Sequence, residues 1–128
     1  DPDTQAGLPC LETSFPEVIE ATIEGRLDDL QLRWSSQVCV GVVLASRGYP
    51  DNPEVNHLVT GLEALDPDIL VFLGAVKREG EDLRTTGGRI LTLAALDSSF
   101  SGARKRIYEN IDRVHCSGSW YRDDIAAV

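Results

Sequence analysis

The chain has 128 residues, a formal net charge of −9, 42% hydrophobic residues and 26% charged residues. This length provides one domain with a core but is too short for a two-domain enzyme, and the composition excludes a disordered chain. The acidic balance argues against a nucleic-acid-binding surface, which needs a basic stripe.

The first strong element is a helix predicted over about residues 15–24. Ser14 as N-cap and Glu17 three residues later fit a capping box. An apolar stripe at helical spacing follows, formed by Val18, Ile19, Thr22 and Ile23. Residues 26–37 are typical of a charged linker, in which Trp34 is expected to plug into the core.

Residues 38–45 form a continuous β-branched run, which predicts a strand covered on both faces. A loop with glycine and proline follows over residues 46–53. Residues 58–62 predict a short strand or turn, and residues 69–73 a second strong strand. We expect residues 69–76 to pair with residues 83–96 as a hairpin whose second arm is interrupted by a glycine turn.

A last helix begins after Ser98 or Ser99, and its apolar positions step by three and four: Phe100, Ala103, Ile107, Ile111 and Val114. The basic residues on its other face are interpreted as solvated charges: Arg104, Lys105, Arg106 and Arg113. A terminal edge strand is expected over residues 118–125. Together these elements predict an α+β fold with a small, mostly antiparallel sheet and flanking helices.

The glycine turn at residues 86–89, before the long second arm of the hairpin, contains the strongest candidates for ligand binding. Gly87 and Gly88 allow backbone amides to approach a ligand, and Arg89 offers a fork of donors to a phosphate or carboxylate. With Thr86 they are typical of an anion cradle at a strand edge. The alternative is that the two glycines only form a hairpin turn and that Arg89 is a solvated flank.

Other chemistry is sparse in the sequence. The three cysteines are far apart and have no CxxC spacing, which indicates reduced thiols. The two histidines have no neighbouring ligand, so we predict no metal site. No apolar run approaches the roughly 18 to 20 residues of a membrane span, and no signal-peptide pattern is present. We expect a cytoplasmic location. The absence of methionine predicts a fragment or a processed chain.

Six blocks along the chain resemble, in order and spacing, the C-terminal part of the phosphoribosylamine–glycine ligase (glycinamide ribonucleotide synthetase) family. They are residues 1–5, 43–50, 60–62, 71–72, 86–91 and 121–125. The resemblance implies an ATP-grasp ligase of purine biosynthesis. Such an enzyme uses ATP and Mg²⁺ (or Mn²⁺) to activate glycine as glycyl phosphate and transfers the glycyl group to 5-phosphoribosylamine, on the route to IMP.

The resemblance also implies a division of the chain. Residues 1–36 would be the tail of the ATP-grasp domain and a linker, and residues 37–128 the small C-terminal domain that covers the site. It places the ATP and metal sites in an upstream lobe, which becomes an expected partner beside the small-molecule substrates. No ATP or metal is then expected on this chain, which would be inactive alone, with neither nucleic acid nor membrane as a partner.

Carried onto this sequence, the family pattern gives roles to individual residues. Asp1 is expected near the sugar or amine of phosphoribosylamine as a catalytic carboxylate, and Thr86, Gly87, Gly88 and Arg89 are expected to hold its 5′-phosphate. Catalysis in such enzymes is positioning and charge neutralisation, so no nucleophilic side chain is expected.

The sequence departs from the family pattern at several positions. VFHAGT is replaced by residues 71–76, TNGGR by residues 85–89, and ASGGYPG by a segment with Arg47, which offers a replacement cation. Two alternatives stay open. The chain would be either a non-catalytic packing or oligomerisation module that kept the fold, or the closing domain of another ATP-grasp ligase.

Overall fold

The computed structural model describes residues 2–127. Its helices are α1 (Asp3–Gly7), α2 (Phe15–Ile23) and α3 (Phe100–Ile111), with short 3-10 turns at η1 (Leu8–Cys10), η2 (Leu27–Asp29) and η3 (Leu62–Ala64). Its strands are β1 (Val38–Ala45), β2 (Leu58–Thr60), β3 (Leu70–Leu73), β4 (Val76–Glu79), β5 (Asp82–Thr85), β6 (Arg89–Asp97) and β7 (His115–Cys116). Among these residues no helix is long and apolar enough to cross a membrane.

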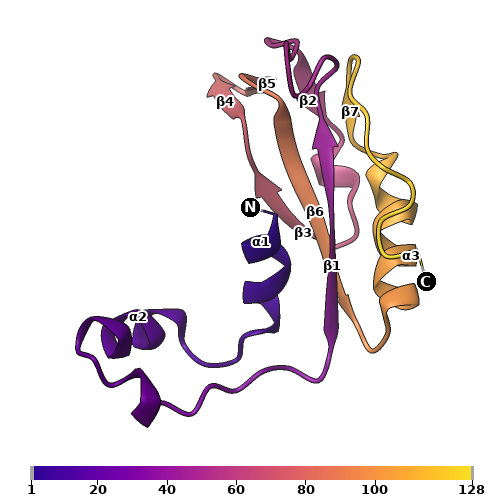
Figure 1. Ribbon diagram of the computed structural model, residues 1–128. Helices are drawn as coiled ribbons and strands as arrows, with labels where there is room; N and C mark the ends of the chain where they lie inside the picture. Colours follow the sequence, from indigo (N-terminus) through magenta and orange to yellow (C-terminus); the bar gives the residue numbers. More distant parts are fainter. Residues whose placement is uncertain (1, 128) are drawn as a thin grey trace.

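The strands form two small antiparallel sheets, which confirms the predicted α+β class. One sheet has the order β1-β6-β3 and the other the order β4-β5-β2-β7. In Figure 1, α3 runs along one side of β1 and β6, and α1 lies on the other side. Gly41 leaves room for Ala6 of α1, since a Cβ on Gly41 would lie 3.9 Å from the Ala6 methyl group. The prediction that β1 is covered on both faces is therefore confirmed.

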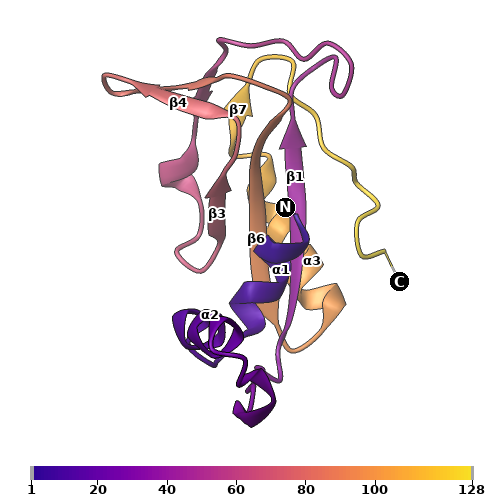
Figure 2. The same ribbon diagram turned by 60° about the vertical axis from the view of Figure 1, so that its left-hand side comes forward.

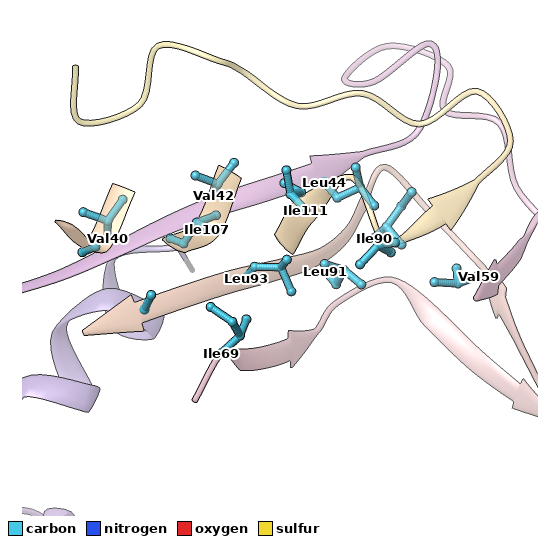
Figure 3. Packing of buried hydrophobic residues seen from close by; sticks show 13 residues of the cluster. Val40, Val42, Leu44, Val59, Ile69, Ile90, Leu91, Leu93, Ile107 and Ile111 are labelled. Atoms are coloured by element: carbon cyan, nitrogen blue, oxygen red, sulfur yellow. The ribbon is translucent and has the colours of Figure 1, made fainter. Parts of the chain in front are cut away.

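The core lies between α3 and the three-stranded sheet. Val42 of β1 faces Leu93 of β6 in the strand register, and both side chains are buried. Figure 3 shows Ile107 and Ile111 of α3 gathered against the side chains from these two strands. Burial of each large aliphatic side chain is worth about 1.5–3 kcal/mol, so this layer dominates the stability of the fold.

The predicted hairpin of residues 69–76 and 83–96 is confirmed in its pairing but divided between the two sheets. β3 pairs with β6 in the first sheet, whereas β4 pairs with β5 in the second. The β4–β5 hairpin projects away from the first sheet in Figure 2. The chain changes sheet at Gly74 and Ala75 on one arm and at residues 86–88 on the other. The glycine turn therefore lies where the two sheets separate.

The N-terminal region follows the predicted helix but not its predicted packing. Ser14 makes no side-chain cap hydrogen bond, so the predicted capping box does not form. Ile19 and Ile23 are 44% and 79% exposed, and Trp34 is 55% exposed. The predicted core plug at Trp34 is therefore wrong. In Figure 2, α2 lies away from the sheets.

Ser99 caps α3, and its hydroxyl accepts a hydrogen bond from the Gly102 amide at 3.1 Å. Phe100 is 52% exposed and does not join the predicted core stripe, whereas the other four predicted positions are buried. Three arginines that we predicted to be solvated are half-buried and donate to backbone carbonyls. Arg104, Arg106 and Arg113 bond the carbonyls of Ile125, Leu96 and Ala64, respectively.

The predicted edge strand over residues 118–125 does not form. β7 ends at Cys116, and beyond it the only pairing in the described residues is an isolated bridge between Ala45 and Trp120. The rest of this C-terminal segment runs beside α3 without a sheet partner (Figure 1). Side chains of α3 satisfy the backbone there in place of a sheet partner.

Candidate functional site

The glycine turn is held from one side by Ser46, which follows β1. The Ser46 amide donates to the Gly88 carbonyl at 2.7 Å, and its hydroxyl donates to the Gly87 carbonyl at 2.9 Å. Ser46 is only 2% exposed, so both bonds are shielded from water. The amides of Gly87 and Gly88 make no hydrogen bond within residues 2–127. Two neighbouring N–H donors are therefore available on a fixed backbone.

The turn is held from the other side by the segment that joins β3 to β4. The Thr86 amide donates to the Ala75 carbonyl at 2.8 Å, and the Ala75 amide donates to the Arg89 carbonyl at 2.7 Å. The Gly74 amide donates to the Ile90 carbonyl at 2.9 Å. Because both flanks are tied, the turn is ordered before any ligand arrives, which lowers the entropy cost of binding.

A glycine is required at position 88 because the Tyr49 ring packs closely against it, and not because of its φ angle. Its φ is outside the left-handed region, but a methyl group at this position would overlap the ring of Tyr49. A Cβ on Gly87 would lie 3.0 Å from the Ala75 methyl group, so this neighbour also has little room. The two adjacent glycines thus let the aromatic ring and the β3–β4 connection meet at the turn.

Two pockets, each of about 270 Å³, are lined in part by Tyr49. We call the first the arginine pocket; it is lined by Pro2, Gly41, Val42, Val43, Ala45, Tyr49, Arg89, Trp120, Arg122 and Ile125. We call the second the glycine pocket; it is lined by Tyr49, Gly74, Ala75, Gly88 and Arg89. Tyr49 and Arg89 line both pockets, so one guanidinium is within reach of either.

The outer wall of the arginine pocket comes from the C-terminal segment. Trp120 exchanges two backbone hydrogen bonds with Ala45 at 2.8 Å each, and its indole N–H donates to the Ser46 carbonyl at 3.2 Å. Arg122 forms a two-bond fork with Asp124, with N···O distances of 2.8 and 2.6 Å. This fork lowers the pKa of Asp124 and raises that of Arg122. It also holds the guanidinium in a fixed orientation.

The structure brings most of the predicted site residues together. Thr86, Gly87, Gly88 and Arg89 form one turn. Arg47 lies elsewhere on the loop: its guanidinium is 3.8 Å from the Glu54 carboxylate, and it lines neither pocket. Asp1 is outside the described residues. A ligand role for each of these residues stays a prediction.

Sequence reasoning missed four wall residues. Tyr49, Arg122 and Ile125 lie in blocks that carried the family resemblance, and Trp120 directly precedes the last of these blocks, but no local pattern indicated that the four residues share a pocket. The signal that was available for Tyr49 was its place between Gly48 and Pro50. The peptide bond between Tyr49 and Pro50 is cis, and Gly48 has a φ of 80°, so this loop turns sharply.

A larger depression of about 500 Å³ lies elsewhere, between β2, β7 and the end of α3. It contains His115, Cys116 and Tyr121 but none of the predicted site residues. We place the candidate site at the two smaller pockets because they are lined by Gly88 of the ordered turn and by Arg89 and Arg122. Within the described part of the chain, no three histidine, cysteine or acidic side chains gather as metal ligands would.

The chain is similar to known proteins over nearly all of its length. The family model described as phosphoribosylglycinamide synthetase, C domain, matches residues 39–128. The phosphoribosylamine–glycine ligase of Halalkalibacterium halodurans is 41% identical over 99% of this chain and 29% of the relative. That of Caldanaerobacter subterraneus is 40% identical over 99% of this chain and 30% of the relative.

Comparison with solved structures gives the same similarity. The crystal structure of phosphoribosylamine–glycine ligase from Thermotoga maritima matches with a TM-score of 0.76 and 30% identity, and the match covers 98% of this chain and 30% of that one. The chain thus spans about 30% of the length of these relatives.

Proposed function

Because this chain belongs to the phosphoribosylglycinamide synthetase C-domain family, we propose that it is the substrate-covering part of a phosphoribosylamine–glycine ligase. In this role it binds the sugar phosphate of 5-phosphoribosylamine while the ligase joins glycine to the amine with hydrolysis of ATP to ADP and phosphate. Residues 1–36 belong to the tail of the ATP-grasp domain in this proposal, and residues 37–128 form the C-terminal domain.

One observation carries the proposal: segments far apart in the sequence meet at a single arginine pocket. Pro2, Tyr49, Arg89 and Arg122 come from four of the blocks that carried the resemblance, and all four line this pocket. A domain kept only for packing has no need to bring these blocks together around two guanidinium groups.

The chemistry of the turn suits a phosphate monoester. The amides of Gly87 and Gly88 are available donors, and Arg89 adds a charged donor beside them. A hydrogen bond to a charged group is worth about 1.5–3 kcal/mol. Because the whole chain has a net charge of −9, these local donors must hold the anion against the overall field.

Among residues 2–127, no three histidine, cysteine or acidic side chains gather as ligands of Mg²⁺ would. The proposal assigns Mg²⁺, and the ATP used with it, to the upstream lobe of such a ligase. What this chain supplies is position: it holds the phosphate end of one substrate so that its amine faces the activated glycine, and Asp1 orients that amine. Positioning of this kind accounts for a large share of the rate of two-substrate reactions.

The exposed stripe on α2 supports the upstream lobe as a partner. Phe15, Ile19 and Ile23 recur every four residues, and their side chains are 47%, 44% and 79% exposed. Apolar side chains on one helix face are typical of an interface. Relatives more than three times as long as this chain contain the additional polypeptide that such an interface requires.

The test is an amide NMR titration of this chain with glycinamide ribonucleotide, the stable product of the reaction. We expect shifts at Gly87, Gly88 and Arg89 that are lost in Arg89→Ala. The matched control is Arg78→Ala, which removes an exposed arginine on β4 that lines neither pocket and should leave the shifts unchanged. A well-dispersed spectrum without shifts in the turn at saturating ligand would refute phosphate binding by this chain and favour the packing module.

A further inference from the structure

The C-terminal segment contributes three side chains to the arginine pocket, but its backbone is paired with a strand only at Trp120 among the described residues. Trp120, Arg122 and Ile125 line the pocket. Of these, only Trp120 is paired with a strand, through its bridge to Ala45. Backbone groups that leave a sheet must find other partners or remain exposed to water. The Ile125 side chain packs against the core, but the backbone of residues 122–125 takes its hydrogen bonds from outside the sheets.

Two side chains of α3 make these contacts. The Arg104 guanidinium donates through Nε to the Ile125 carbonyl at 3.0 Å and through Nη2 to the Asp123 carbonyl at 2.5 Å. The Tyr108 hydroxyl donates to the Arg122 carbonyl at 2.6 Å and accepts a bond from the Ile125 amide at 3.3 Å. Four hydrogen bonds with two side chains thus hold three of the four residues 122–125 by their backbone.

Arg104 and Tyr108 also support each other. They are four residues apart on one helix face, where side chains are neighbours. The guanidinium carbon of Arg104 lies 4.5 Å from the centroid of the Tyr108 ring, within cation–π range. The planar fork of an arginine can serve two carbonyls at once, and a tyrosine hydroxyl can donate and accept together. Lysine has no planar fork of donors, and phenylalanine has no hydroxyl.

We propose that Arg104 and Tyr108 are positioning residues for the ligand pocket. They do not line the pocket themselves. Through the backbone of residues 122–125 they fix Arg122 and Ile125 as its outer wall. This inference rests on the proposed function for the identity of the ligand, but the placement of the wall can be measured without any ligand.

The first measurement is the heteronuclear NOE of residues 121–126 in Arg104→Gln and Tyr108→Phe, compared with the unchanged chain. We expect the NOE to fall in this segment in both variants while it stays high in β1 and β6. The second is a titration with ribose 5-phosphate, followed at Gly87 and Gly88. We expect the dissociation constant to rise about five- to tenfold in each variant, as for the loss of one net hydrogen bond or slightly more. Arg104→Lys should not restore it.

Arg113→Gln is the matched control. Arg113 follows the end of α3 and also holds a loop, because it donates to the Ala64 carbonyl at 2.9 Å and to the Asp66 carboxylate at 2.8 Å. We expect this variant to lose thermal stability without a change in the NOE of residues 121–126 or in the affinity. An affinity loss equal to that of Arg104→Gln would reduce the role of Arg104 to general stability and overturn the proposal.

The two proposals fail in different ways. Unchanged NOE values in both variants would overturn the positioning role whether or not ribose 5-phosphate binds. Failure of the unchanged chain to bind ribose 5-phosphate, together with a loosened segment in the variants, would refute the proposed function and leave the positioning of the pocket wall supported.

Discussion

Gly88→Ala tests whether the contact between the glycine turn and Tyr49 organises the site. A methyl group at this position would overlap Cδ2 of the Tyr49 ring and lie 2.9 Å from Cε2. The φ of Gly88 is not in the left-handed region, so backbone strain does not contribute. The turn cannot simply withdraw, because its carbonyls are bonded to the buried Ser46. The ring of Tyr49 must move instead.

The magnitude follows from the ways in which the overlap can be relieved. A ring turned about 30° from its rotamer costs about 0.5–1.5 kcal/mol, and a shift of the backbone costs about 1–3 kcal/mol. We expect a loss of about 1–2 kcal/mol in the free energy of unfolding, or about 4–8 °C in Tm. Affinity for ribose 5-phosphate should fall as well, because Tyr49 lines both pockets.

The assay is thermal unfolding followed by circular dichroism, on a double-mutant cycle with Tyr49→Ala. Removing the ring removes the overlap, so Gly88→Ala should cost much less in the Tyr49→Ala background than in the unchanged chain. Gly7→Ala is the matched control, since a Cβ there meets nothing within 4 Å. Additive costs of the two substitutions, or wild-type stability of Gly88→Ala, would refute the argument.

Three further predictions concern stability and titration. Asn110→Ala should cost about 2–3 kcal/mol, measured by urea unfolding, because the buried Asn110 side chain makes three hydrogen bonds of 2.9 Å, two of them with Asp66. The hydrogen bond to Asp112 raises the pKa of Tyr121 from 10.0 to about 12. The contribution of this bond to the free energy of unfolding is therefore complete below pH 10 and is lost as the pH rises to 12. Tyr121→Phe should remove this fall in stability between pH 10 and 12, measured by unfolding at alkaline pH. Burial raises the pKa of the Cys39 thiol from 9.0 to about 11, so iodoacetamide at pH 8 should alkylate Cys39 about a hundredfold more slowly in the folded than in the unfolded chain, as read by mass spectrometry.

The elements predicted with the least ambiguity were those with a long periodic pattern. β1 and α3 appear at the expected residues because a β-branched run and a stripe at steps of three and four each favour one backbone state. An amphipathic pattern shows that one face of a helix requires an apolar partner, but it does not identify the segment that packs there. The stripe on α2 predicted the helix, but it did not predict that Ile19 and Ile23 are exposed among the described residues.

The site was predictable only in its local part. Gly87, Gly88 and Arg89 are adjacent in sequence, so the turn and its donors were visible as a pattern. The walls were not, because Trp120 and Arg122 reach the pocket through long-range contacts. The arginines of α3 were misread for the same reason. A charged helix face normally faces water, and only the path of the C-terminal segment gives Arg104 its carbonyl partners.

The departures from the family pattern differ in what they mean for binding. Val76 stands where relatives commonly have a threonine, and it packs against the hydrophobic core, so the lost hydroxyl is replaced by apolar contact. Leu73 stands where they have a histidine; it is 50% exposed and directly precedes Gly74 of the glycine pocket. Thr86 replaces an asparagine in the turn itself and is exposed. A change in ligand preference would therefore arise at Leu73 and Thr86, beside the donors, whereas Val76 affects the stability of the sheet junction that holds them.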